Sequence, residues 1–382
     1  MRMNKLIIIL NILLIFILWE KVMSNDEENE LIYQINKSKY AEEVFKIDTT
    51  ILKIPVEYDG GKIIGIYITK DSLIVLSYFF SPQVQIFDKN GKLIKNLSNM
   101  GDQPGGFNMP WFATEIQNKI VVGEHSSGKL HLFNKDGSFN RTIRLQKWMM
   151  VDGICTILDS LFVINDISAA RYKKKNNVCI YNIKGEILEK FGELSDIGKK
   201  LSRLNYSPCG PMIAAKDEYI YHINYCDYHV CKYDINGKLI SKFGNKPDDW
   251  KSMSKINIEK VSKNMMADVQ EYLKRLHYYS MLNWISICKA DVLIMELQQK
   301  KDYDNNIKRI MLYNLEGKLL HPGLIIKSCS EHYANSDVNL LPVESKGFAV
   351  LIRSGGNFKT EKGDMVNLKL LVYTMVNSKE RR

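Results

Sequence analysis

The sequence predicts an all-β protein, a six-bladed β-propeller with four-stranded blades, and three observations lead to this prediction. A turn motif recurs five times, its copies are separated by about the length of one blade, and a further set of strands follows the last copy. The chain has 382 residues, of which 45% are hydrophobic, so it can bury a large core.

The recurring motif is an aromatic residue, Asp or Asn, two residues, Gly, one residue and an apolar residue, as in the stretch QIFDKNGKLIKNL. The Asp or Asn side chain accepts hydrogen bonds from backbone a few residues on. The Gly supplies the positive φ of a hairpin turn with a bulge. We therefore expect each copy to join two antiparallel strands. The copies place these residues at Asp88 and Gly91, Asn134 and Gly137, Asn182 and Gly185, Asp234 and Gly237, and Asn314 and Gly317.

The glycines are spaced by 46, 48, 52 and 80 residues. The first three intervals match one blade each, and two strand patterns precede each turn, such as IIGIYIT and SLIVLSYF before VQIF. The last interval predicts one blade plus an insertion between blades four and five, at residues 245–282. Apolar residues at helical spacing favour a helix there, packed on the rim of the propeller or walling its central funnel. They are Val261, Met265, Val269, Tyr272 and Leu276.

The sixth blade lacks the Gly turn and shows only three strand patterns, NLLPVES, GFAVLIR and LKLLVYTMV. An unpaired strand, Thr49–Val56, precedes blade one. If it becomes the fourth strand of blade six, the ring closes and no sheet edge is left open there. We therefore expect the propeller to span 48–382, after an acidic linker at 25–47.

Residues 1–24 have the pattern of a signal peptide. Arg2 and Lys5 precede the apolar run Leu6–Trp19, which is short for a membrane span, and cleavage is expected after Ser24. The alternative is an uncleaved anchor that contacts the membrane only through residues 6–19. Either form predicts an exported protein, in the periplasm or cell envelope.

The stretch IFDKNGKLIKNL, followed by GDQPGGF (Gly101–Phe107), resembles an NHL-type repeat. Later links between blades keep only KFGE (Lys190–Glu193) and KFGN (Lys242–Asn245). From about Thr49 onward the chain resembles the bacterial exported six-bladed β-propeller proteins related to NHL repeats. This resemblance implies a binding scaffold, and it supplies no catalytic residue.

Ligand contacts are expected on the face formed by the links between blades and the loops joining second to third strands. The longest of these loops are 165–177, 298–306 and 354–367. Long loops on a rigid scaffold are where function concentrates, although loops also lengthen without any function. The candidate ligand-binding residues are Trp111, Arg171, Tyr172, Lys173, Lys174, Lys175, Lys300, Lys301 and Asn357.

The seven cysteines show no disulfide framework. The segment His222–Cys231 offers the best zinc ligands, at His222, Cys226, His229 and Cys231. However, side chains alternate faces along a strand, so the four cannot easily converge. We therefore predict no metal and no cofactor, and favour a Cys226–Cys231 disulfide or packed thiols.

The net charge of +10 permits a nucleic-acid partner, but lysines are spread over predicted turns and export argues against it. We therefore expect no nucleic acid and a protein, peptide or glycan partner in the cell envelope. The alternative is a metal-dependent hydrolase or lyase of the six-bladed propeller type with its site in the central funnel. The predicted inner strands WFATE, GICTIL and PMIAA offer only Glu115 as a ligand, so no catalysis is predicted.

Overall fold

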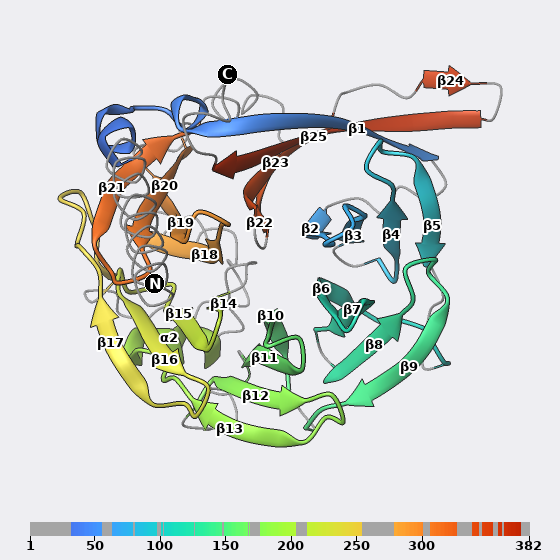
Figure 1. Cartoon of the computed structure of the whole chain (residues 1–382), viewed down its shortest axis with the longest axis horizontal. Coiled ribbons are helices and arrows are strands. Elements are labelled where there is room, and N and C mark those ends of the chain that lie inside the picture. Colours follow the sequence, from blue (N-terminus) through green and yellow to red (C-terminus); the bar gives the residue numbers. More distant parts are fainter. Residues whose placement is uncertain are drawn as a thin grey trace, which may run out of the picture.

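The computed structural model describes residues 32–55, 63–78, 81–97, 101, 103–125, 127–146, 149–166, 168, 176–203, 212–253, 279–300, 306–326, 338–343, 346–353, 358–360 and 363–375. They form six antiparallel sheets arranged as a ring around a central axis (Figure 1). The predicted six-bladed propeller is confirmed. No helix in these ranges is long and apolar enough to cross a bilayer.

Each of the first five blades runs in chain order from an inner strand to an outer strand. Blade one holds β2 (Ile63–Ile68), β3 (Ile74–Tyr78), β4 (Val84–Phe87) and β5 (Leu93–Leu97). Blade two holds β6 (Pro110–Ile116), β7 (Lys119–Glu124), β8 (Lys129–Phe133) and β9 (Phe139–Arg144). Blade three holds β10 (Val151–Ile157), β11 (Leu161–Asp166), β12 (Val178–Asn182) and β13 (Ile187–Phe191).

Blades four and five follow the same order, after a helix α2 (Asp196–Arg203) that sequence reasoning did not predict. Blade four holds β14 (Ile213–Lys216), β15 (Tyr219–Ile223), β16 (Val230–Asp234) and β17 (Leu239–Phe243). Blade five holds β18 (Met281–Ile287), β19 (Val292–Lys300), β20 (Asn306–Asn314) and β21 (Leu319–Ile325). The predicted helical insertion lies mostly outside the described residues, and β18 takes in the last two residues assigned to it.

Blade six is built from both ends of the chain. It contains β22 (Val338–Val343), β23 (Gly347–Arg353), β25 (Gly363–Met375) and, as the outer strand, β1 (Phe45–Pro55). β1 pairs antiparallel with β25 along its whole length, which confirms closure by an N-terminal strand. A short strand that was not predicted, β24 (Phe358–Thr360), pairs with the start of β25, and this ribbon extends beyond the ring (Figure 1).

The segment predicted as an acidic linker is structured from residue 32 onward. A helix covers 32–37 and a 3₁₀ turn, η1, covers Ala41–Glu43. Ile35, Ala41 and Val44 are fully buried in the apolar layer between blades five and six. These three apolar residues attach residues 32–47 to the propeller. The linker prediction rested on the acidic composition of the segment and did not take them into account.

The core consists of six apolar layers, one between each pair of neighbouring blades. The layer between blades one and two shows how a link contributes. Phe107, at the end of the GDQPGGF link, is fully buried there, and its ring centroid lies 5.6 Å from that of Phe133. The link therefore inserts its aromatic residue between the two sheets that it connects.

The five turn motifs have the predicted geometry. Their glycines all have positive φ, between 72° and 91°. In blade one, Oδ1 of Asp88 accepts hydrogen bonds from the N–H groups of Asn90 and Lys92, at 2.9 and 3.0 Å. Blade two is a variant, because there Asp136 Oδ1 accepts the N–H of Ser138 instead.

Each turn glycine also lies against the outer strand of the preceding blade. A Cβ added to Gly317 would lie 2.4 Å from Cγ of Phe243, and one on Gly237 would lie 2.8 Å from Cδ1 of Phe191. On Gly91 it would lie 2.1 Å from the carbonyl oxygen of Ile51 in β1. Two separate constraints therefore require glycine at these positions: the positive φ of the turn and the close contact with the preceding blade.

We predict that Gly317→Ala lowers the free energy of unfolding by at least about 2 kcal/mol. A left-handed Ala costs about 1–2 kcal/mol, and the clash with Phe243 adds to that cost. Gly323→Ala in the same blade is the control, because no positive φ is needed there and the nearest atom, at 3.2 Å, belongs to the flexible Arg309 side chain. Urea denaturation of both variants measures the difference, and equal midpoints would contradict the prediction.

Candidate functional site

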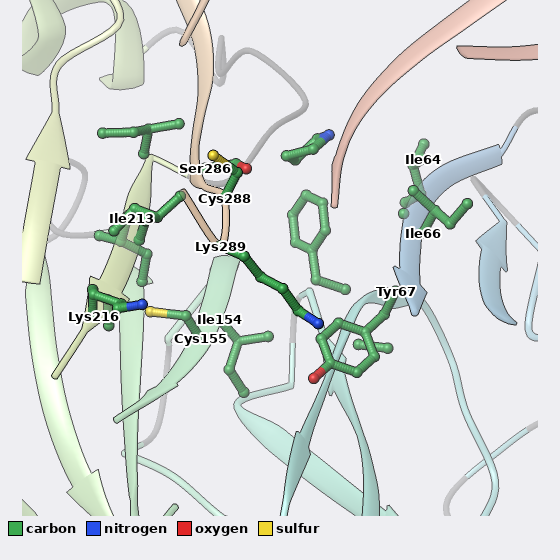
Figure 2. Close-up of a pocket in the computed structure, with 18 residues that line it drawn as sticks. Ile64, Ile66, Tyr67, Ile154, Cys155, Ile213, Lys216, Ser286, Cys288 and Lys289 are labelled. Atoms are coloured by element: carbon green, nitrogen blue, oxygen red, sulfur yellow. The ribbon is translucent and has the colours of Figure 1, made fainter. Parts of the chain in front are cut away.

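The inner strands of all six blades surround a central cavity of about 150 Å³. Its walls are mostly apolar, and their side chains come from strands that are distant in the sequence (Figure 2). The wall residues with apolar side chains include Ile64, Ile66, Phe112, Ile154, Ile213, Ile285, Ile287 and Pro342.

The polar side chains of the cavity are cationic or neutral. Lys216 and Lys289 line it, together with Tyr67, and no Asp, Glu or His is among the described lining residues. Lys216 Nζ lies 2.9 Å from Oδ1 of Asp291, and this hydrogen bond raises the pKa of Lys216. Lys289 is exposed in the turn between β18 and β19, so the cavity is apolar with positive charge at one end.

Three further groups in the cavity are not activated for reaction. Burial raises the pKa of the Cys288 thiol, which keeps it neutral. The hydroxyl of Ser286 donates a 2.7 Å hydrogen bond to the carbonyl of Gly347 in blade six. No lining imidazole or carboxylate stands beside Cys155, Cys288 or Ser286 as a base. The cavity therefore presents binding surface and no nucleophile–base pair among the described residues.

Glu115, the one inner-strand carboxylate noted in the sequence, is a structural residue. It is buried, its Oε1 lies 3.0 Å from Lys135 Nζ, and its Oε2 accepts the N–H of Lys70 at 2.9 Å. Lys135 also lies 2.8 Å from Asp71, so this network ties blade one to blade two. Within the described ranges, no group of three or more His, Cys, Asp or Glu residues could hold a metal ion.

The four residues considered as zinc ligands point to different partners. Nε2 of His222 contacts Asn177 at 3.1 Å, and Nδ1 of His229 contacts Asp227 at 2.6 Å. The thiol of Cys226 lies against Met253 Sδ at 3.7 Å, and Cys226 and Cys231 are both free. Of the two arrangements expected for Cys226 and Cys231, a disulfide or packed thiols, the structure has packed thiols.

Most of the predicted loop-face residues lie outside the described residues, namely Arg171 to Lys175, Lys301 and Asn357. Lys300 is the last residue of β19 and pairs with Asn306. Trp111 is buried in the apolar layer between blades two and three and is only 4% exposed. It lies in a bulge between Pro110 and Phe112, and its ring stacks on His125 at a centroid distance of 4.2 Å.

A buried carboxylate anchors the loop face in each of blades two and three. Glu124 ends β7, and its Oε1 accepts the N–H of Asn108, which precedes the inner strand, at 2.6 Å. Asp166 ends β11 and in the same way accepts the N–H of Met150, at 3.2 Å, and that of Ser168, at 3.0 Å. Each carboxylate thus joins a loop to the link between blades.

The ionisation of Glu124 strengthens this anchor. Burial opposes its charge, but contacts with the side chains of His131 and Ser127 and the N–H of Asn108 outweigh burial and lower the pKa of Glu124 to about 2. The carboxylate is therefore ionised at neutral pH and acts as a strong acceptor. Sequence reasoning missed both anchors, although each carboxylate stands directly at the start of a loop.

The loop of blade three ends on a second buried polar cluster. The amide of Asn177 donates to Oδ1 of Asn165 at 3.2 Å and contacts Nε2 of His222 at 3.1 Å. If Nε2 accepts this bond, Nδ1 carries the proton. A Cβ added to Gly192 would lie 3.1 Å from Asn177 Oδ1 and 3.5 Å from His222 Nδ1, so these atoms face a glycine. Burial lowers the pKa of His222 to about 4.

Comparison with known proteins supports the fold class. No family model and no curated protein sequence matches the chain. A "putative exported protein" from Bacteroides fragilis matches with a TM-score of 0.57 at 12% identity, over 86% of this chain and 95% of that one. A DUF4221 family member from Bacteroides vulgatus matches with a TM-score of 0.54 at 11% identity, over 88% and 99%.

An enzyme has the same fold. Virginiamycin B lyase from Staphylococcus aureus matches with a TM-score of 0.50 at 10% identity, over 87% of this chain and all of that one (100%). At such identities the likeness extends to the fold alone. The chain is therefore a six-bladed β-propeller whose fold is shared by a putative exported protein, a DUF4221 family member and a lyase.

We predict that His222 makes stability depend on pH. A His whose pKa falls to about 4 on folding contributes stability above its unfolded pKa near 6.5, and this stability is lost as pH falls toward 4. The loss amounts to on the order of 3 kcal/mol. His222→Asn should flatten the curve of unfolding free energy between these pH values relative to the unsubstituted protein. Parallel curves over this range would contradict the prediction.

Proposed function

We propose that the protein is an exported propeller that binds a protein, peptide or glycan of the cell envelope through its loop face and does no chemistry on it. Export is supported by the pattern of residues 1–24 and by the "putative exported protein" of the same fold. The observation that carries the binding proposal is the anchoring of the loops by Glu124, Asp166 and the Asn177–His222 cluster.

Buried polar anchors hold the two ends of a loop in place, which favours recognition by the loop that they flank. The loop between Asp166 and Asn177 contains Arg171, Tyr172 and Lys173 to Lys175. This composition suits an acidic partner, since Arg and Lys donate charge-assisted hydrogen bonds and Tyr offers stacking area. Lys300, Lys301 and Asn357 belong to loops expected on the same face.

The alternative function is a metal-dependent hydrolase or lyase. It is supported by the fold that this chain shares with virginiamycin B lyase. The described cavity lining does not favour it. Zinc and calcium ions are held by carboxylate, imidazole or thiolate ligands. The cavity lining instead offers lysines, which repel cations, and the Cys288 thiol, which burial keeps neutral.

Charge reversal at Lys173, Lys174 and Lys175 to Glu should weaken partner binding at least about tenfold, since three charge-assisted contacts become repulsions. Binding is measured by retention on immobilised polyglutamate and on an immobilised uronic-acid glycan, and with envelope extract. The matched control reverses Lys89, Lys92 and Lys238, exposed lysines of the Gly turns on the opposite face. Equal loss in both triple variants would point to net charge alone and overturn the loop-face assignment.

Elemental analysis of the protein purified from its natural compartment separates the two functions. The binding proposal expects no stoichiometric metal, because the described cavity lining lacks a ligand set. One tightly bound ion per chain that survives dialysis would overturn the proposal in favour of the metal-dependent enzyme.

A further inference from the structure

We propose that the central cavity is a second binding site, and that it takes a small carboxylate with an apolar body, such as a short aliphatic or aromatic acid. Its hydrocarbon part would lie among the inner-strand isoleucines, and its carboxylate would pair with Lys289 and Lys216. This site is distinct from the loop face of the proposed function and does not depend on it.

The walls of the cavity suit a hydrocarbon. Ile64, Ile154, Ile213 and Ile285 are each at most 5% exposed, and they come from four different blades. An apolar cavity of about 150 Å³ is large enough to bind benzene in another protein. The cavity of about 150 Å³ found here therefore admits a ligand of roughly the size of a single aromatic ring.

The charged end of the cavity selects for an anion. Two lysines and no carboxylate are among the described lining residues. Lys216 shares its ammonium group with Asp291, which lies outside the lining set. In Figure 2 the side chain of Lys289 extends into the cavity on the side of Tyr67. Lys289 is exposed and Lys216 is half-buried, so the carboxylate would accept charge-assisted hydrogen bonds at the mouth of the cavity while its hydrocarbon part lies inside.

A carboxylate fits this set of donors better than a phosphate does. Phosphate sites usually combine Arg forks or a helix N-terminus with several backbone N–H groups. The described lining contains two lysines and no arginine. Apart from Cys288 and Lys289, all the described lining residues belong to inner strands, so no helix N-terminus among them points into the cavity. Because Lys216 is already paired with Asp291, the two lysines leave a single uncompensated positive charge at the end of the cavity, which matches a singly charged head on a hydrocarbon body.

The position of the lysines also separates this site from the loop face. Strands alternate in direction, so the turns between first and second strands lie on the same face as the Gly turns. Lys289 stands in such a turn, between β18 and β19, and Lys216 ends β14 just before another. The charged end of the cavity thus lies on the face opposite the ends of β11 and β12 that flank residues 167–177.

The test uses benzoate and its uncharged counterpart benzyl alcohol as probes, with the whole chain, in calorimetric or saturation-transfer NMR titrations. Benzoate should bind, and benzyl alcohol at least about fivefold more weakly. Lys289→Met should weaken benzoate at least about fivefold and leave benzyl alcohol unchanged, since only the charge pair is removed. Lys238→Met, an exposed lysine on the Gly turn of blade four, is the matched control and should bind benzoate normally.

A second variant tests the location. Ala113 lines the cavity and is only partly buried, so Ala113→Phe should fill the channel and abolish binding of both probes. Circular dichroism shows whether this variant folds. If it does not, the benzoate affinities of Lys289→Met and Lys238→Met still test whether Lys289 binds the carboxylate. Absence of benzoate binding to the unsubstituted protein, or equal affinity in Lys289→Met, would overturn the proposal. The triple reversal of Lys173 to Lys175 should leave benzoate binding intact, so this site and the loop face fail independently.

Discussion

The contact between each turn glycine and the preceding blade is the constraint on which the ring depends. Gly237 closes the hairpin of blade four and at the same time lies where a Cβ would be 2.8 Å from Phe191 of blade three. The same glycine therefore allows the hairpin turn and the close packing of one blade against the preceding blade. This contact recurs from Gly91, which lies against β1, to Gly317, which lies against Phe243. A motif that sets a local turn thus also sets how neighbouring blades pack around the ring.

Closure of the ring needs both chain ends, and the N-terminal segment does more than supply a strand. β1 completes blade six, while Ile35, Ala41 and Val44 fill the layer between blades five and six. Tyr373 donates a 3.0 Å hydrogen bond to Glu42, so the final strand is bonded to the segment before the first. The apolar layer between blades five and six is thus completed by residues that precede the first strand of the ring.

Sequence reasoning predicted the features that depend on short-range physics. The Asp–Gly turns and the strand count follow from side-chain chemistry within a few residues, and the closing strand follows from the need to pair sheet edges. Features that depend on contacts between blades were missed. Trp111 was expected to contact ligand, and its stacking on His125 depends on a bulge that no local pattern marks. The cavity, with Ile64 and Lys289 from distant parts of the chain, could not be predicted from any one segment.

The turns between first and second strands differ from the Gly turns in a way that bears on the channel. Asp159 and Asp291 adopt positive φ, 49° and 56°, although they are not glycine, and this conformation costs each about 1 kcal/mol or more. Both carboxylates bond to a neighbouring blade: Asp159 accepts the N–H of Gln117 at 2.9 Å, and Asp291 pairs with Lys216. A glycine would relax the backbone and lose these bonds. The strain is therefore offset by contacts that fix the blades around the channel mouth, which is where Lys216 and Lys289 must be held if the channel is to recognise a carboxylate.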